Sequence, residues 1–410
     1  MKIEHTHISV EELALQRNRF AHLNDEQFRF MLQQVDGRER TREKLPSFAA
    51  IEDWWYPVRL SCEQCSSELT ARYKASQLPK EAFTLTDLTG GYGVDTYFMS
   101  SNATQAHYVE RNQELCNIVR HNFELTRPNV HIHNTEAVAY LQEMQHSDVI
   151  YIDPARRDQY GGKVFRIEDC EPNLIDILDT LREKSNTIII KLSPMLDITR
   201  ALLSLKGKWD VHIVAVKNEV KEILLISHQS RYHSVTTSEG NARDDEGMVY
   251  ATNLIPTPSH DDYSTRIFSF SMNEERDARC FHYEESKKYL ISSGIYIYEP
   301  NAAIIKAGAF KLIAQRYELC KMSINTHLYL SDKLVEDFPG RVWQIVATDI
   351  KKHKDIRANI MTRNYPLTPE QLRKKLKIKD SDTHTIIGAR LGEKPCLFLA
   401  ERIDQHTASC

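Results

Sequence analysis

The reactive side chains of this chain gather in two short motifs, and the first is a glycine-rich turn. An apolar strand pattern within TLTDLTGGYGVD, over 84–95, ends at Asp87 and runs into that turn. Glycine has no Cβ to keep a bound molecule away from the main chain, and it adopts positive φ freely. Gly90, Gly91 and Gly93 therefore predict a cradle for a ligand.

The second motif, DVIYIDPARR over 148–157, is another buried-type strand, which ends in an acid and a proline. In open α/β sheets the ligand lies at the carboxyl ends of the parallel strands. Asp153 and Pro154 are therefore expected at the same edge of the sheet as the glycine turn, facing the group that reacts. Lys191 and Ser193, at the end of a later strand, are expected at this edge as well.

Two kinds of nucleotide ligand suit a glycine turn of this type. A dinucleotide site would read G-x-G-x-x-G, and Thr96 stands where the third glycine belongs. A carboxylate at Asp87 would repel a pyrophosphate, but it would accept hydrogen bonds from an ammonium group. The turn, which includes Thr89, therefore favours S-adenosylmethionine, because the methionine end of that cofactor carries an ammonium.

Two further acids are expected along the same cofactor. Glu110, at the end of the next strand, is placed to bind both ribose hydroxyls, a role that either cofactor would need. The strand after it ends in HNTEA over 133–137, where the polar side chain of Glu136 is expected to meet the adenine amino group. The alternative for this stretch is a plain helix N-cap by Asn134 or Thr135.

The apolar runs from residue 83 onward alternate strands with helices, which predicts a mostly parallel sheet with helices on both faces. Two runs at 211–216 and 222–227 are joined by five residues, too few for a crossover helix, and predict an antiparallel hairpin at the sheet edge. The fold class is α/β, with a Rossmann-like, seven-stranded sheet. The parallel strands are predicted at 85–88, 107–110, 130–133, 149–152 and 187–192, with helices at 94–99, 113–125, 137–144, 174–181 and 195–205.

At 410 residues the chain exceeds the roughly 250–300 at which single cores stop growing, so several domains are expected. The first is a helical region in which Gly37 is expected to end a helix, and the smaller C-terminal domains are of the α+β type. A strand at 296–300 and a helix over 302–317 are expected in the third domain. The predicted domains are a helical region over 1–79, the sheet domain with the cofactor site over 80–260, a small ferredoxin-like domain over 261–335 and a last domain over 336–410.

Composition excludes several classes of protein. No apolar run approaches the roughly 20 residues that span a bilayer, and the N-terminus lacks signal-peptide features, so we expect a cytoplasmic protein without a membrane partner. The pair Cys62 and Cys65 and the pair His131 and His133 each lack further ligands at suitable spacing. No metal site is therefore expected.

The net charge of −4 means that any contact with nucleic acid needs a local basic patch. The stretch 351–379 supplies one, because its ten lysines and arginines outnumber its two acids. Such a stripe attracts phosphates independently of sequence. The alternative is an ordinary solvated face.

The residues of both motifs resemble those of the class I S-adenosylmethionine-dependent methyltransferases, over roughly residues 68–229. DLTGGYG over 87–93 is similar to the cofactor loop of that class, Glu110 to its ribose acid and DPAR over 153–156 to its catalytic-loop motif. The resemblance implies a Rossmann-like domain that binds S-adenosylmethionine and transfers its methyl group.

The whole chain more closely resembles a group of bacterial methyltransferases with a C-terminal THUMP-like domain, named for its similarity to an RNA-binding module. EPNAAIIKAG over 299–308 and TRNYPL over 362–367 carry this likeness. The group's substrate is not settled, and we expect a base in ribosomal or transfer RNA, with RNA as the partner. A protein or small-molecule methyltransferase, or a non-catalytic RNA-binding protein on the same scaffold, are the alternatives.

The expected catalytic residues are Asp153, Pro154 and Arg156. Enzymes that methylate exocyclic amines of bases typically have Asp or Asn, two prolines and an aromatic residue. Here Ala155 and Arg156 replace the second proline and the aromatic residue, which argues against an exocyclic amine as the acceptor. Arg156 is expected to stack on a flipped base and Arg157 to hold a phosphate, unless they pair with acids of a neighbouring loop. Lys191 and Ser193 are expected to contact the substrate.

Overall fold

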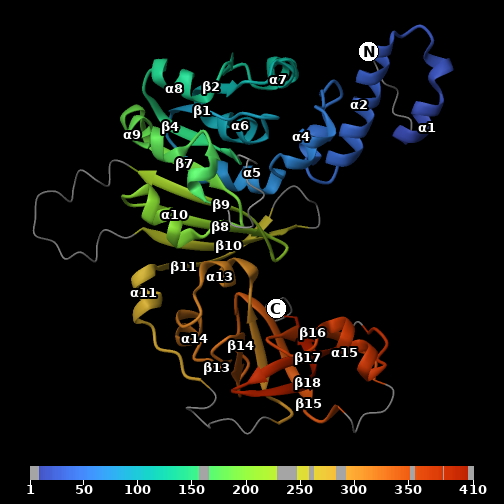
Figure 1. Ribbon diagram of the computed structural model, residues 1–410, viewed down its shortest axis with the longest axis vertical. Helices are drawn as coiled ribbons and strands as arrows, with labels where there is room; N and C mark the ends of the chain where they lie inside the picture. The colour runs from blue at the N-terminus through green and yellow to red at the C-terminus, as the bar shows by residue number, and fades with distance from the viewer. Residues whose placement is uncertain are drawn as a thin grey trace, which may run out of the picture. The chain divides into compact units, whose positions relative to one another are not determined.

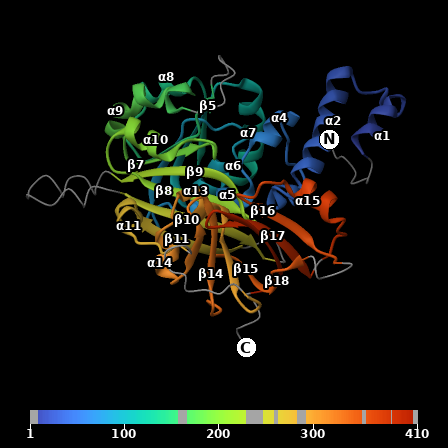
Figure 2. The same ribbon diagram turned by 60° about the horizontal axis from the view of Figure 1, so that its bottom comes forward.

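The computed structural model describes residues 9–156, 166–228, 247–257, 263–282, 292–350, 356–381 and 383–404. The chain divides into two compact units, which are labelled by element in Figures 1 and 2. The first unit comprises Met1–Val216, Lys221–Asp245 and Leu254–Ser264, and the second comprises Lys217–Val220, Glu246–Asn253 and Thr265–Cys410. The four domain boundaries expected from the sequence stay predictions.

The first unit begins with helices, as the sequence predicts. Helix α2 begins behind Asn24, whose side chain accepts a hydrogen bond from the Gln27 backbone while the Gln27 side chain caps Asn24 in return. The prediction that Gly37 ends a helix is wrong, because α2 continues to Thr41; a Cβ at Gly37 would lie 2.3 Å from the Tyr56 Cβ, so this glycine permits a close approach. The helices of this region are α1 (Val10–Leu15), η1 (Arg17–Phe20), α2 (Asp25–Thr41), α3 (Pro46–Ala49), α4 (Arg59–Gln64) and α5 (Glu68–Ala75).

A nine-stranded sheet follows, in the order β11-β10-β8-β9-β7-β4-β1-β2-β3. Strands β7, β4, β1, β2 and β3 run parallel, and β9 pairs antiparallel with β7, so the expected seven-stranded sheet is present as its last seven members. Its strands are β1 (Phe83–Asp87), β2 (Ala103–Glu110), β3 (Val130–Asn134), β4 (Ser147–Ile152), β7 (Ser185–Leu192), β8 (Asp210–Val216), β9 (Glu219–His228), β10 (Met248–Pro256) and β11 (Tyr263–Ser271).

The predicted hairpin forms between β8 and β9. Its two turn residues, Lys217 and Asn218, have φ of 50° and 66°, which is the geometry of a two-residue type I′ turn. The hairpin does not end the sheet, because β10 and β11 continue it beyond β8. From the sequence, the polar segment 229–259 is expected to be a domain junction with a strand or two embedded in it, and this expectation does not include the pairing of β10 with β8.

The helices that flank the sheet form two groups on its two faces (Figure 1). Helix α5 packs against α6 on one face, and α9 packs against α8 and α10 on the other. The remaining elements of this part are α6 (Val94–Met99), η2 (Ser100–Asn102), α7 (Gln113–Thr126), α8 (Ala137–Glu143), β5 (Ala155–Arg156), η3 (Ile167–Asp169), β6 (Cys170–Glu171), α9 (Leu174–Lys184) and α10 (Ile198–Leu205). Among the helices that the structure describes, none has both the length and the apolar character needed to cross a bilayer.

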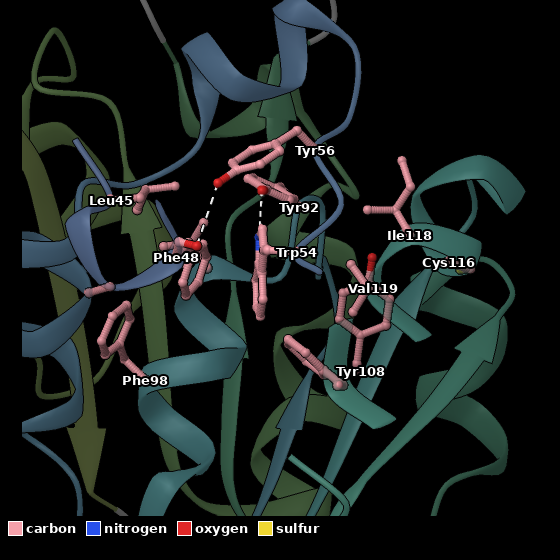
Figure 3. Close-up of a cluster of buried hydrophobic side chains, with 13 residues drawn as sticks. Leu45, Phe48, Trp54, Tyr56, Tyr92, Phe98, Tyr108, Cys116, Ile118 and Val119 are labelled. Atoms are coloured by element: carbon pink, nitrogen blue, oxygen red, sulfur yellow. Dashed lines mark hydrogen bonds between the residues drawn. The ribbon is translucent and has the colours of Figure 1, made fainter. Parts of the chain in front are cut away.

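An aromatic core joins the N-terminal helices to the glycine turn (Figure 3). The rings of Phe48 and Trp54 are tilted against each other with centroids 4.1 Å apart, and the Trp54 indole donates a hydrogen bond of 2.8 Å to the hydroxyl of Tyr92, within the turn. Tyr92 and Tyr108 are buried in the same cluster. The aromatic residues of the helical region therefore pack as core, and they hold the turn from behind.

The second unit is built on a seven-stranded sheet in the order β13-β14-β12-β15-β18-β17-β16, in which β16 and β17 are parallel. The helix expected over 302–317 is wrong as a single element: Gly308, with φ of 76°, ends α13, and α14 starts afresh. The elements are α11 (Met272–Asp277), β12 (Tyr296–Pro300), α13 (Ala302–Ala307), α14 (Leu312–Arg316), β13 (Cys320–Ser323), β14 (Thr326–Ser331), β15 (Gly340–Ala347), β16 (Asn359–Arg363), α15 (Pro369–Leu376), β17 (His384–Leu391) and β18 (Lys394–Ile403).

Candidate functional site

A cavity of about 720 Å³ lies in the first unit, at the carboxyl ends of β1, β2 and β4. Its volume is within the range of roughly 300–1,000 Å³ that small-molecule sites occupy. The predicted site residues that line it are Asp87, Thr89, Gly90, Gly91, Gly93, Glu110, Glu136, Asp153, Pro154 and Lys191. Two motifs separated by more than fifty residues are thus brought to one hollow.

Three predicted site residues are not placed in this lining. Ser193 lies in the turn after β7, where its Oγ accepts a hydrogen bond from the Met195 backbone, and it is not among the residues that line the cavity. The backbone of Arg156 forms the short strand β5, while its side chain and the whole of Arg157 lie outside the described residues.

The glycine turn is shaped by close contacts and by positive φ. Gly91 and Gly93 have φ of 54° and 78°, and α6 begins directly after Gly93. A Cβ on Gly90 would lie 2.1 Å from the ring of Tyr108, whose hydroxyl donates a 2.5 Å hydrogen bond to the Gly91 carbonyl. Main chain therefore faces the cavity here, as a cradle for a ligand requires.

Asp87 ends β1 as a buried acid. Its Oδ1 accepts a hydrogen bond from the Thr89 backbone at 3.0 Å, and its Oδ2 accepts one from Thr96 Oγ1 at 2.5 Å. Burial raises the pKa of Asp87 to about 7, although both hydrogen bonds oppose that rise. A cation in the cavity would favour the ionised form of this carboxyl.

Glu110 meets the glycine turn from the end of β2. Its Oε2 accepts a hydrogen bond from the Gly91 backbone at 3.0 Å, and its Oε1 accepts one from the Asn112 backbone at 2.8 Å. Carboxylate oxygens each have a second lone pair, so these bonds leave capacity for ligand hydroxyls. Glu110 thus lies beside the turn, where the sequence places a ribose-binding acid.

Neither Asn134 nor Thr135 is the N-cap residue of α8, so the alternative interpretation of this stretch is wrong. Glu136 is the N-cap residue and makes no capping hydrogen bond with its side chain. Asn134 is not free to cap, because its side-chain amide donates to the carbonyls of Glu110 and Arg111 at the end of β2. The exposed Glu136 carboxylate lies on the cavity wall, 4.0 Å from the Arg111 guanidinium.

Asp153 is linked to the glycine turn and to β7. Its backbone N–H donates to Thr89 Oγ1 at 2.6 Å, which ties the two motifs together. Its Oδ2 accepts a hydrogen bond from Lys191 Nζ at 2.5 Å. Pro154 is buried and lines the cavity next to it.

A buried charge network, not foreseen from the sequence, lies beneath this pair. Lys74 of α5 is fully buried, with Nζ 2.6 and 2.7 Å from the two carboxylate oxygens of Glu222. The same ammonium is 3.2 Å from Asp95 Oδ1, and Lys191 Nζ is 3.8 Å from Asp95 Oδ2. Burial favours the neutral form of Asp95, but Lys74 and Lys191 outweigh it and lower the pKa of this carboxyl.

The N-terminal helical region also contributes to the cavity wall, through Ser61, Gln64, Cys65 and Ser66. Ser66 Oγ donates to Asp95 at 2.8 Å, so this part of the wall meets the charge network. The sequence does not predict these four residues as part of the site, because they reach the cavity only through the packing of α4 and α5 against the sheet domain.

Acids dominate the described lining of the cavity. Its seven carboxylate residues, Asp87, Asp95, Glu110, Glu136, Asp153, Glu171 and Asp176, face two cationic ones, Arg111 and Lys191. This excess suits a cationic ligand such as a sulfonium with an ammonium group, and disfavours a pyrophosphate. Within the described residues, no three histidine, cysteine or acidic side chains are grouped to hold a metal ion.

Known protein families match the C-terminal part of the chain. The model of a ferredoxin-like domain family matches residues 296–339, and the model of a THUMP domain-like family matches residues 341–402. Both matches lie in the second compact unit.

Relatives that span nearly the whole chain carry methyltransferase names. A crystal structure from Porphyromonas gingivalis W83, described as a "putative methyltransferase", is 31% identical, with coverage of 96% of this chain and 98% of that one and a TM-score of 0.80. An uncharacterized S-adenosylmethionine-dependent methyltransferase of Mycobacterium tuberculosis, from strains CDC 1551 and H37Rv, is 20% identical over 347 residues, which cover 82% of this chain and 85% of the relative. The chain therefore belongs to the S-adenosylmethionine-dependent methyltransferases with C-terminal ferredoxin-like and THUMP-like domains.

Proposed function

We propose that this enzyme transfers a methyl group from S-adenosylmethionine to a base in ribosomal or transfer RNA, and that its THUMP-like domain holds the RNA. The observation that carries the proposal is the pairing of an acid-lined cofactor cavity with a THUMP-like match in one chain. Bound S-adenosylmethionine supplies an electrophilic methyl group. Position and alignment of the acceptor supply much of the rate of such a displacement.

The residues proposed to hold the cofactor follow the cavity wall. Asp87 and the main chain of the glycine turn bind the methionine end, Glu110 binds the ribose hydroxyls, and Glu136 binds the adenine amino group. Asp153 and Pro154 lie at the methyl end, with Arg156 as their proposed partner against the base. The hydrogen bond from the Asp153 backbone to Thr89 links the part of the wall proposed for the methyl group to the part proposed for the methionine end.

Glu110→Gln is expected to weaken S-adenosylmethionine binding by roughly tenfold, because the ribose hydroxyls lose charge-assisted hydrogen bonds while the side chain keeps its shape. Isothermal titration of the purified protein measures this change. Glu114→Gln, an exposed acid at the start of α7, is the matched control and should bind as the unchanged protein does. Equal affinity of both variants would contradict the ribose assignment.

The affinity for S-adenosylmethionine is expected to rise between pH 5.5 and 7 and to lose that slope in Asp87→Asn. The pKa of Asp87 is raised to about 7, so the folded protein keeps a proton at pH values where an unfolded aspartate, with its pKa near 3.8, has lost it. As pH rises through 7 the carboxylate forms and attracts the cofactor ammonium, which stays charged below about 7.7. Titrations across this range, on both proteins, test the assignment; a slope that persists in the variant would contradict it.

The basic stretch of the second unit supports RNA as the partner. Lys374, Lys375, Lys377 and Lys379 are exposed around the end of α15. Two arginines of the stretch are already paired, since Arg373 lies 2.6 Å from Asp380 and Arg363 lies 2.6 Å from Glu299. Lys351, Lys352 and Lys354 of the same stretch lie outside the described residues.

Mass spectrometry of nucleosides from cells with and without the gene tests the proposed substrate. A methylated nucleoside that disappears from ribosomal or transfer RNA, and returns with the purified enzyme, would support it. An unchanged nucleoside profile would move the substrate to another class.

A protein or small-molecule acceptor is the second candidate, and the acid excess in the cavity lining favours it, because seven acids repel a polyanion. In that case the lysines near α15 are a solvated face. Methylation that is insensitive to added salt would support this candidate, since RNA binding through phosphates weakens steeply with salt.

A further inference from the structure

The acceptor end of the cavity contains the ion pair of Asp153 and Lys191, which uses only one of the two carboxylate oxygens of Asp153. Lys191 Nζ contacts Asp153 Oδ2 at 2.5 Å, while Asp153 Oδ1 has no hydrogen-bond partner among the described residues. The Asp153 side chain is 37% exposed and lines the cavity. One carboxylate oxygen therefore faces the space in which an acceptor would lie.

Lys191 is badly placed to bind a substrate itself. Its side chain is only 14% exposed, and its ammonium lies between Asp153 and Asp95. Burial opposes its charge, but Asp153, Asp95 and Glu222 together raise the pKa of Lys191, which keeps it cationic. A lysine held in this way is a poor base and a good fixed counter-ion.

The position of Lys191 is in turn held by Asp95 and the residues that contact Asp95. Asp95 Oδ2 accepts hydrogen bonds from Tyr151 at 2.6 Å and from Ser66 at 2.8 Å. Lys74, fully buried and paired with Glu222, lies on the other side of Asp95. These contacts come from α5, α6, β4 and β9, so the position of Lys191 is fixed by several elements at once.

We propose that Lys191 is a positioning residue, which holds the Asp153 side chain with Oδ1 toward the acceptor, so that the enzyme methylates a group that carries its own hydrogen, an amine or a hydroxyl. The proposal rests on the proposed function, and it replaces the substrate contact expected for Lys191 from the sequence. A carboxylate only accepts hydrogen bonds. It therefore orients an N–H or O–H group and repels a bare lone pair.

The transfer is balanced with these groups. The lone pair of the acceptor nitrogen or oxygen forms the new bond to the methyl carbon, and the carbon–sulfur bond breaks with its electron pair left on sulfur. The acceptor hydrogen leaves as a proton to Asp153 Oδ1 and passes from there to water. A single carboxylate oxygen is enough to take this one proton, although Ala155 and Arg156 depart from the motif typical of enzymes that methylate exocyclic amines.

The kinetic test uses an extract of cells that lack the gene as the source of acceptor, with methyl-labelled S-adenosylmethionine. Lys191→Met is expected to lower the maximal rate about a hundredfold, because Asp153 loses its fixed position, while the amount of extract that gives half the maximal rate stays unchanged. Lys191→Arg should recover much of the rate, since its guanidinium also pairs with carboxylates. Lys80→Met, at an exposed lysine, is the control. A normal rate in Lys191→Met would overturn the proposal.

A second readout needs no acceptor. With ¹⁵N-labelled lysine, the protein should show a protected ammonium resonance that is absent in Lys191→Met and that moves in Asp153→Asn. Isothermal titration with S-adenosylhomocysteine should give the same affinity for Lys191→Met and the unchanged protein, which confirms that the cavity is intact. An ammonium resonance that ignores Asp153→Asn would overturn the ion pair.

The labelled product separates the proposal from the substrate assignment. Label on an exocyclic amine or a ribose hydroxyl of RNA supports it, although a ribose product would contradict the base as acceptor. Label on an amine or hydroxyl of a protein or small molecule supports it too, while the RNA substrate fails. Label on a ring carbon, a ring nitrogen without hydrogen or a thioether would overturn it, as would an absence of label in every fraction.

Discussion

Gly90→Ala is expected to weaken S-adenosylmethionine binding by about tenfold to a hundredfold and to lower the free energy of unfolding by about 1–3 kcal/mol. The added Cβ would lie 2.1 Å from Tyr108 Cε2 and 2.3 Å from Cδ2, in a ring that is fully buried. Neither the ring nor the strand beneath it can move away freely, so the turn itself must shift. The variant binds the cofactor only in molecules whose turn has returned to its original conformation. The apparent Kd rises as the fraction of such molecules falls.

Gly91→Ala is the comparison that isolates this contact. Its Cβ would have only one neighbour, the Thr89 carbonyl at 3.9 Å, so its cost comes from the φ of 54° alone, about 1–2 kcal/mol. Isothermal titration and urea unfolding of both variants measure the difference. If Gly91→Ala lowered the free energy of unfolding more than Gly90→Ala, contact with Tyr108 would not be what shapes the turn.

The sequence predicts the sheet domain well because each of its elements has a local signal. Apolar runs separated by helical patterns give the parallel strands, and the short link near Lys217 gives the hairpin. The continuation of the sheet into β10 and β11 has no such signal, since strand pairing depends on partners far along the chain. Gly37 and Gly308 look alike in the sequence, yet one permits contact with Tyr56 and the other ends a helix.

The candidate site divides in the same way. Residues at strand ends, such as Asp87, Glu110 and Asp153, are predictable because topology brings the ends of parallel strands to one edge. Lys74 is not, because a lysine in a short helix beside Arg72 is most often exposed. Lys74 is buried because α5 packs beside β9, where Lys74 pairs with Glu222. This packing joins parts of the chain that are far apart in the sequence, so it has no local signal.

Lys74→Met is expected to lower the free energy of unfolding of the first unit by about 3–5 kcal/mol. The ammonium lies within 3.2 Å of two buried acids, Glu222 and Asp95, and its removal leaves both carboxylates with less compensating charge inside the protein. Urea unfolding followed by tryptophan fluorescence measures this loss. A Trp343→Phe background confines the signal to Trp54, Trp55 and Trp209, all in the first unit.

The double variant Lys74→Met with Glu222→Gln decides whether the loss comes from charge or from packing. If uncompensated charge dominates, neutralising Glu222 recovers part of the stability, and the double variant is more stable than the sum of the two single changes predicts. If packing dominates, the double variant is no more stable than Lys74→Met alone, because neutralising Glu222 fills no space. Lys80→Met, at an exposed position, should cost almost nothing and controls for the loss of a lysine as such. A loss below about 1 kcal/mol in Lys74→Met would mean that the ion pair of Lys74 and Glu222 stabilises the protein no more than an exposed ion pair does. That result would contradict the view that this network holds Lys191 in a fixed position.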